Sequence, residues 1–194
     1  MREFNRALLE ELFRRAELHL KKKGIVGEIL LFGGSAMIFA FSERTHTKDI
    51  DAYFVPKEEV KSALLAAAHE LGISPEKEDW LSTAVLRYIY GRPPKKLETI
   101  YDGTHLRVFV PSKDYLLAMK LFAARDEKDF EDAVKLAEML GLKTEKELIE
   151  VFKKVFPEYY LEDRRKGFLK EVADALQEKR RIIITNDSSP RSTS

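Results

Sequence analysis

Cysteine and long hydrophobic runs are both missing from this sequence of 194 residues. Without cysteine, the chain has no disulfide, no thiolate nucleophile and no cysteine-ligated zinc or iron–sulfur centre. No apolar stretch reaches the roughly 18 residues that a transmembrane helix needs, and the amphipathic N-terminus lacks the apolar centre of a signal peptide. We therefore expect a cytoplasmic protein without a membrane partner.

Amide side chains are scarce, and neither sign of charge dominates. Asparagine and glutamine occur only at Asn5, Gln177 and Asn186, a composition that resembles heat-adapted (thermophile) proteins. The 34 Lys and Arg residues nearly cancel the 33 Asp and Glu residues, so the formal net charge is +1. This balance argues against an acidic disordered protein and against a tail-driven nucleic-acid binder. A nucleic acid would have to bind at a local basic patch, for which residues 87–96 are the candidate.

Hydrophobic periodicity and the positions of glycine divide the chain into a mixed α/β part and a helical part. Short apolar runs bounded by turn residues predict strands at residues 28–32, 49–55, 97–101 and 105–110. Apolar residues at helical spacing predict helices at residues 4–23, 35–41, 57–71, 113–124, 127–140, from 144 onward, and 162–181. Residues 80–90 fit either a helix or a strand.

This order of elements favours an α+β fold over a doubly wound parallel sheet, because strands and helices do not continue to alternate. We expect a small mixed β-sheet core with helices over residues 1–111. A helical C-terminal region over residues 112–185 is expected to pack on this core. The polar, aperiodic residues 186–194 are expected to form a disordered tail.

A glycine pair and a serine connect the first predicted strand directly to a helix. Gly33 and Gly34 allow a sharp backbone turn and the close approach of a ligand to the main chain. The helix that follows offers free N–H groups and the positive end of its dipole to an anion, and Ser35 adds a hydroxyl at the same point. The segment predicts a small phosphate site, although the same residues are also typical of a simple tight turn.

Two carboxylates lie on the next predicted strand. Asp49 and Asp51 are expected to project from one face because alternate residues of a strand share a face, while Ile50 faces the core. Like charges repel unless a cation lies between them, and hard oxygen ligands suit Mg²⁺ or Mn²⁺. The alternative is a harmless pair of acids on an exposed strand edge. Ser35 precedes Asp49 by only 14 residues, so the phosphate site and the carboxylates are predicted neighbours, as nucleotidyl transfer requires.

One apolar predicted helix carries a lysine, and the next carries two acids one turn apart. Burying an ammonium is costly unless it is paired, so Lys120 is either functional or extends from the helix edge to solvent. Asp129 and Asp132 share a helix face, and they either belong to a site or form surface pairs with neighbouring basic residues.

Together, Gly33-Gly34-Ser35 and Asp49-Ile50-Asp51 resemble the signature of the polymerase-β-like nucleotidyltransferase superfamily. The fuller string LFGGSAMIFAFSERTHTKDIDAYF is similar to the AbiEii-like group, whose members include toxins of bacterial and archaeal toxin–antitoxin systems. That group also carries a later helical Lys, followed by an Arg/Lys-Asp-x-x-Asp run that matches residues 128–132 here. The resemblance covers roughly residues 28–140.

The resemblance implies a ligand for each half of the first motif pair. Asp49 and Asp51 would hold the divalent metal, Mg²⁺ or Mn²⁺. Gly33, Gly34 and Ser35 would hold the triphosphate of an NTP substrate.

For the later motif, the resemblance implies that Lys120 reaches a phosphate or the substrate hydroxyl and that Asp129 completes the acidic site. Many members of the superfamily instead place a third metal-binding carboxylate on a later strand. Asp102 and Glu98 lie near that place in the sequence, so the third carboxylate is either Asp129 or Asp102.

We therefore expect a metal-dependent nucleotidyltransferase that moves a nucleoside monophosphate from an NTP to an acceptor hydroxyl. The resemblance implies an RNA (tRNA) or protein acceptor, and a cognate antitoxin as a partner. One alternative is a catalytically inactive nucleotide-binding or antitoxin-like module of the same fold. A purely structural α+β protein is the other, and it would leave the acid pair beside the glycine turn unexplained.

Overall fold

The computed structural model of the chain describes residues 3–40, 46–73, 80–85, 89 and 92–187, and of residues 182–187 it describes the backbone only. The chain divides into two compact units, Met1–Ser112 and Lys113–Ser194. Within the described ranges, no helix is both long enough and apolar enough to cross a membrane.

The first unit is built on a five-stranded mixed sheet. Its helices are α1 (Arg6–Lys22), α2 (Gly33–Ala40) and α3 (Lys57–Glu70). Its strands are β1 (Gly27–Phe32), β2 (Ile50–Val55), β3 (Leu81–Ser82), β4 (Leu97–Asp102) and β5 (Leu106–Pro111).

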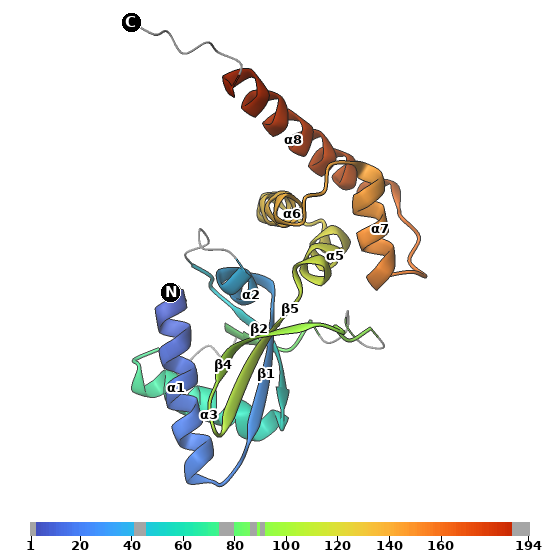
Figure 1. Cartoon of the computed structure of the whole chain (residues 1–194). Coiled ribbons are helices and arrows are strands. Elements are labelled where there is room, and N and C mark those ends of the chain that lie inside the picture. Colours follow the sequence, from blue (N-terminus) through green and yellow to red (C-terminus); the bar gives the residue numbers. More distant parts are fainter. Residues whose placement is uncertain (1–2, 41–45, 74–79, 86–88, 90–91, 188–194) are drawn as a thin grey trace, which may run out of the picture. The chain divides into compact units, whose positions relative to one another are not determined.

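The five strands form one sheet (Figure 1), in the order β3-β2-β1-β5-β4 with β1 at the centre. β1 runs antiparallel to β2 and parallel to β5. The edge strand β3 is parallel to β2, and the edge strand β4 is antiparallel to β5. A mixed sheet with helices, followed by an all-helical unit, confirms the predicted α+β class.

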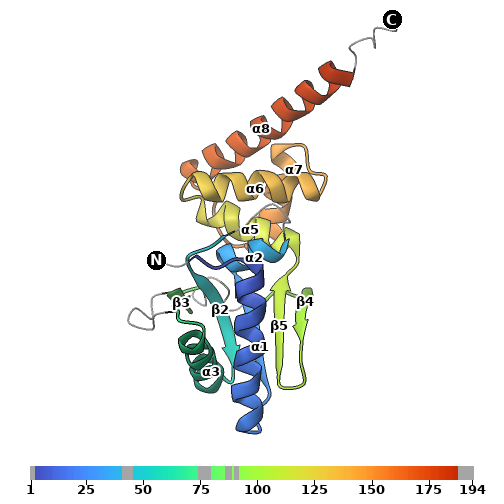
Figure 2. The ribbon, with the colours of Figure 1, turned by 90° about the vertical axis from the view of Figure 1, so that its left-hand side faces the viewer.

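Helices α1 and α3 pack against each other and cover one face of this sheet (Figure 2). The strands alternate as a half-covered sheet requires, so every second residue lies under the helices. Fully or almost fully buried residues of this layer include Leu12, Phe13, Ile29, Leu31, Phe54 and Leu64. This core fixes the register of β1 and β2, and therefore the level at which the site residues leave the sheet.

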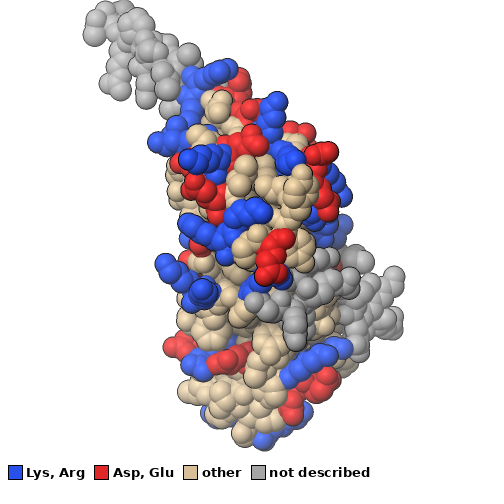
Figure 3. Space-filling model, turned by 90° about the vertical axis from the view of Figure 1, so that its right-hand side faces the viewer, with Lys and Arg blue, Asp and Glu red and all other residues tan. Residues whose placement is uncertain are grey.

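The opposite face of the sheet is more open in the described part of this unit, and much of the surface in the lower part of Figure 3 is uncharged. By strand alternation, Tyr53, Val55 and Leu97 belong to this face, and each exposes more than 40% of its surface. The ion pair between Arg107 and Glu28 crosses the same face from β5 to β1.

The second unit consists of helices α5 (Lys113–Ala123), α6 (Glu127–Met139), α7 (Glu145–Val155) and α8 (Asp163–Asp187). α5 contacts α6, α7 and α8, and its Phe122 ring packs against Phe156 at 4.5 Å and Tyr159 at 4.8 Å. Thr144 and Glu147 form the predicted capping box at the start of α7, because each side chain accepts the other's backbone N–H.

The structure corrects several predicted boundaries. Phe4 is not in the first helix, because the Asn5 side chain accepts the N–H of Leu8 and starts α1 at Arg6. Within residues 80–90, which fitted either a helix or a strand, the structure describes residues 80–85 and 89; Leu81–Ser82 form the short strand β3, and the rest lies outside the described residues. α8 extends to Asp187, beyond the predicted residue 181, since neither glycine nor proline interrupts residues 168–189. The remainder of the expected tail, residues 188–194, lies outside the described residues.

Candidate active site

The predicted phosphate turn is the junction between β1 and α2. Gly33 has φ of +54°, a left-handed backbone that only glycine adopts without strain, and it is the first residue of α2. β1 therefore passes into the helix with no intervening loop, and the first N–H groups of α2 lie at the end of a central strand.

The Asp51 carboxylate lies directly against this turn. β1 and β2 pair with Phe32, the last residue of β1, opposite Asp51, so the next residue of the chain, Gly33, follows immediately beside Asp51. A Cβ added to Gly33 would lie 2.4 Å from Asp51 Oδ2, which is closer than a Cβ approaches another heavy atom in real structures. Glycine is therefore required at position 33 for two reasons: the backbone conformation is left-handed, and the Asp51 carboxylate occupies the space that a side chain would need.

Asp49 lies just before β2, which begins at Ile50 rather than at the predicted residue 49. Ile50 is fully buried, as expected, while Asp49 is exposed and Asp51 is half-buried. The segment before Asp49 is anchored, because Phe4 and Thr47 exchange both backbone hydrogen bonds at 2.7 and 2.8 Å. The Thr47 hydroxyl also donates to the Asp49 carbonyl at 3.2 Å, which fixes the chain where it enters β2.

Ser35 is fully buried, and its hydroxyl donates to the Phe32 carbonyl at 2.9 Å. The side chain therefore ties the last residue of β1 to the first turn of α2. Gly34 is half-buried beside it. The hydroxyl, which the sequence suggested as a phosphate ligand, already has an internal acceptor, so Ser35 offers its backbone N–H at the helix start.

Neither strand carboxylate that the sequence offered as a third acid joins Asp51. Asp102 pairs with Arg107 on β5, and Arg107 is in register with Glu28 on β1 and therefore with Val55 on β2. Val55 lies roughly 13 Å along β2 from Asp51. Glu98 lies at about the same level of the sheet as Asp51, but it is on the edge strand β4, which is three strand spacings, or roughly 14 Å, from β2.

The donor set of this turn suits Mg²⁺ together with a nucleotide. Mg²⁺ is usually held by one or two carboxylates, while water and substrate phosphates complete its octahedron. Asp49 and Asp51 would supply two such carboxylates. Among the residues that the structure describes, no group of three or more His, Asp or Glu side chains is placed to hold a metal ion. Substrate phosphate oxygens would have to supply further ligands.

The predicted residues of the second unit form a buried ion cluster between α5 and α6. Lys120 Nζ lies 2.7 Å from Asp129 Oδ1 and 2.8 Å from Asp132 Oδ2. Arg125, in the connection between the two helices, donates to Asp129 Oδ2 through Nε at 3.0 Å and through its backbone N–H at 3.3 Å. Asp126 caps α6 by accepting the Asp129 N–H. Lys120 is therefore paired, and it does not extend freely to solvent.

The cluster balances two carboxylates with two cations, and most of it is dry. Only 8% of Lys120, 1% of Asp129 and 5% of Asp132 is exposed. Burial by itself raises the pKa of the Asp129 carboxyl, but the hydrogen bond from Arg125 and the charge of Lys120 outweigh it, so this pKa lies below its ordinary value. Asp129 is held as an anion whose two oxygens both face cations.

One residue near these groups, Ser82, was not singled out from the sequence. Ser82 on β3 is in register with Asp51 on β2, and no sequence signal marked it because residues 80–90 had no clear periodicity. Trp80, two residues before Ser82, is packed on Phe4 at 5.3 Å, and its buried Nε1 has no hydrogen-bond partner among the described residues. Of the basic stretch 87–96, Arg87 lies outside the described residues.

The residues of the β1–α2 turn and those of the Lys120 cluster both lie within a match to a known protein family. The sequence of most of the chain matches the model of a nucleotidyltransferase family. The family is described as "Nucleotidyltransferase of unknown function (DUF6036)"; its model matches residues 7–166, and the chain belongs to it. Searches of curated proteins and of solved structures gave no match to this chain.

Proposed function

We propose that this protein is a metal-dependent nucleotidyltransferase. It binds an NTP with Mg²⁺ or Mn²⁺ at the β1–α2 turn and transfers the nucleoside monophosphate to an acceptor hydroxyl. The acceptor oxygen forms a bond to the α-phosphorus, the bond between the α- and β-phosphates breaks, pyrophosphate leaves, and the acceptor proton is released.

A single observation carries this proposal: the Asp51 carboxylate occupies the space that a side chain at position 33 would need. A carboxylate and a helix start with donor N–H groups therefore lie side by side, and the family match over residues 7–166 includes both. A tight turn alone does not require a carboxylate against its first glycine.

The residues of the turn have separate roles in the proposal. Asp49 and Asp51 hold the metal, which supplies positive charge against the phosphates and lowers the pKa of the attacking hydroxyl. Backbone N–H groups of Gly33, Gly34 and Ser35, aided by the α2 dipole, hold phosphate oxygens. The buried Ser35 hydroxyl keeps the turn in place through Phe32.

In the second unit we propose that Lys120 binds a phosphate oxygen and that Asp129 positions it. An ammonium has three N–H donors, and the two carboxylates of the cluster use two of them. Because both Asp129 oxygens already accept from cations, a positioning role suits Asp129 better than a third metal ligand.

The proposed acceptor is the hydroxyl of an RNA, such as a tRNA, or of a protein. An RNA acceptor would contact the basic stretch that includes the exposed Lys95 and Lys96. A role in a toxin–antitoxin pair, with a cognate antitoxin as regulator, is part of the same proposal and rests on the sequence resemblance to AbiEii-like proteins.

The test is transfer of label from each α-labelled NTP, with Mg²⁺ or Mn²⁺, to total RNA and to total protein. The Asp49→Ala/Asp51→Ala double variant should lose transfer by more than about 100-fold, since charge stabilisation by a metal is worth several kcal/mol. Asp102→Ala is the matched control, because it removes an exposed acid from the opposite end of the sheet, and it should keep full activity.

Two outcomes would decide against the proposal. If the double variant still transferred label, the catalytic metal would not be bound at the turn. NTP-dependent rise in melting temperature without transfer to any acceptor would instead support a nucleotide-binding module of the same fold.

A further inference from the structure

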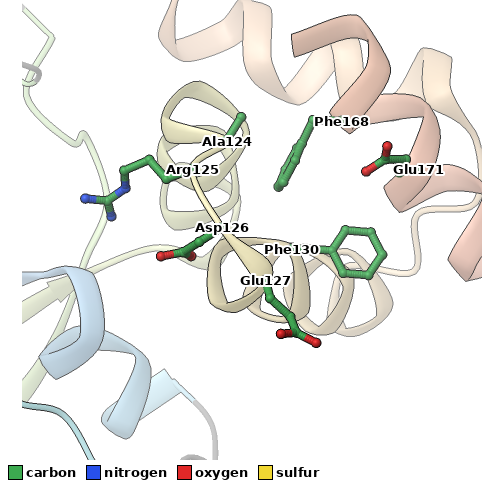
Figure 4. Close-up of a pocket in the computed structure, with 7 residues that line it drawn as sticks. All are labelled: Ala124, Arg125, Asp126, Glu127, Phe130, Phe168 and Glu171. Atoms are coloured by element: carbon green, nitrogen blue, oxygen red, sulfur yellow. The ribbon is translucent and has the colours of Figure 1, made fainter. Parts of the chain in front are cut away.

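A cavity of about 300 Å³ opens in the second unit beside the connection between α5 and α6 (Figure 4). Its residues come from that connection, from α6 and from α8, and they are Ala124, Arg125, Asp126, Glu127, Phe130, Phe168 and Glu171. The size is at the lower end for a small-ligand pocket. The family match ends at residue 166, so the α8 wall of the cavity lies beyond it.

Two aromatic rings and a carboxylate face the same space. The Phe130 and Phe168 rings are 6.2 Å apart and almost perpendicular, and both are only half-buried. Glu171 lies one turn after Phe168 on α8, and its carboxylate points toward the rings in Figure 4. A ligand here would meet two π-faces or edges and one negative charge.

The charges around the cavity leave it negative. Three acids, Asp126, Glu127 and Glu171, and one cation, Arg125, are among the lining residues. The Asp126 and Glu127 carboxylates point away from the two rings in Figure 4, so Glu171 supplies the carboxylate that faces the cavity. The Arg125 side chain extends to the other side of the connection in Figure 4, where its Nε is bound to Asp129. An anion such as a phosphate is therefore disfavoured inside the cavity, while a cation is attracted.

We propose that this cavity binds an organic cation, the guanidinium or ammonium end of a basic side chain from a protein partner. Aromatic rings attract such cations through their quadrupole, and a nearby carboxylate adds charge complementarity. Charge complementarity also distinguishes this occupant from a purely apolar side chain, which would gain nothing from the Glu171 carboxylate. The binding does not depend on nucleotidyl transfer.

The probe is N-acetyl-arginine amide. It is titrated into the full chain, and the phenylalanine ring resonances are monitored by NMR. N-acetyl-citrulline amide is its neutral isostere, and N-acetyl-norleucine amide is an apolar probe of similar length. We expect the arginine probe to shift the Phe130 and Phe168 resonances, with saturation in the millimolar range or above, and the other two probes to bind at least about fivefold more weakly.

Phe168→Leu should weaken the arginine probe about 3- to 30-fold by removing one cation–π contact. Glu171→Gln, which keeps the shape, should weaken it about 2- to 5-fold and reduce its dependence on salt. Glu178→Gln is the control, because Glu178 is an exposed acid on the same helix outside the cavity. It should leave binding unchanged, and circular dichroism checks that each variant is folded.

Equal binding of the citrulline or norleucine probe would contradict the proposal, because charge would then not select the ligand. Absence of any shift with the arginine probe would contradict it as well. A loss of binding with Glu178→Gln as large as with Glu171→Gln would assign the effect to net charge rather than to this cavity.

Discussion

Replacing Gly33 with alanine tests the apposition of the glycine turn and the Asp51 carboxylate. An L residue in the left-handed region costs about 1–2 kcal/mol, and alanine recovers about 0.4–1 kcal/mol by restricting the unfolded chain. At Gly33 the new Cβ would also stand 2.4 Å from Asp51 Oδ2, so the carboxylate must leave its position. Overpacking of this kind costs about 1–3 kcal/mol more. Gly33→Ala should therefore lower the free energy of unfolding by about 2–4 kcal/mol.

Gly24→Ala provides the matched control in the same unit. Gly24 has φ of +65°, and a Cβ added to it would meet nothing within 4 Å, so this variant carries the backbone cost without the clash. Its expected loss is about 1 kcal/mol. Urea unfolding followed by tryptophan fluorescence reports on this unit specifically, because the single tryptophan of the chain is Trp80.

A double-mutant cycle separates the clash from every other effect. In an Asp51→Ala background the nearest remaining atom, the Cβ of residue 51, is 3.4 Å from the added methyl group, which is ordinary contact. The excess cost of Gly33→Ala over Gly24→Ala should then disappear. If the two glycine variants lose equal stability, or if the excess persists without the carboxylate, Asp51 does not lie against the turn.

Three further predictions concern other contacts. Lys120→Met should cost about 3–5 kcal/mol in urea unfolding followed by circular dichroism, because it strands two buried carboxylates, whereas Lys128→Met at an exposed position should be near neutral. Burial and the hydrogen bond to Glu17 raise the pKa of Tyr101 to about 12, so stability that is complete below pH ~10 should fall as pH rises through ~12, and Tyr101→Phe should lack this fall in pH-dependent unfolding. Ala124→Gly should raise the melting temperature slightly, by relieving a φ of +42° that costs an L residue about 1–2 kcal/mol; a lower melting temperature would contradict that strain.

Local signals were enough to predict most helices and strands. Gly33 and Gly34 between an apolar run and a helical segment predicted the β1–α2 junction, and the alternation after Asp49 predicted β2. These elements depend on hydrophobic period and turn chemistry within short windows, which a sequence displays directly.

Pairing between distant segments was the part that the sequence could not supply. The strands before and after Asp102 were predicted, but only the parallel pairing of β5 with β1 shows that Asp102 lies at the end of the sheet away from Asp51. The bridge between Phe4 and Thr47 likewise joins segments far apart in the chain. The helical spacing placed Asp129 and Asp132 on one face, but not the lysine of α5 that both contact.

The acidic residues of the two predicted motifs are not chemically equivalent. Asp129 and Asp132 are buried and neutralised by a lysine and an arginine, so a metal ion binding them would have to displace cations that already satisfy them. Asp49 is exposed and Asp51 is half-buried, beside backbone N–H donors that suit phosphate. A divalent metal that arrives with a nucleotide therefore has no buried ion pair to displace at the β1–α2 turn. For this reason we propose the metal site at that turn and a phosphate-binding role for Lys120.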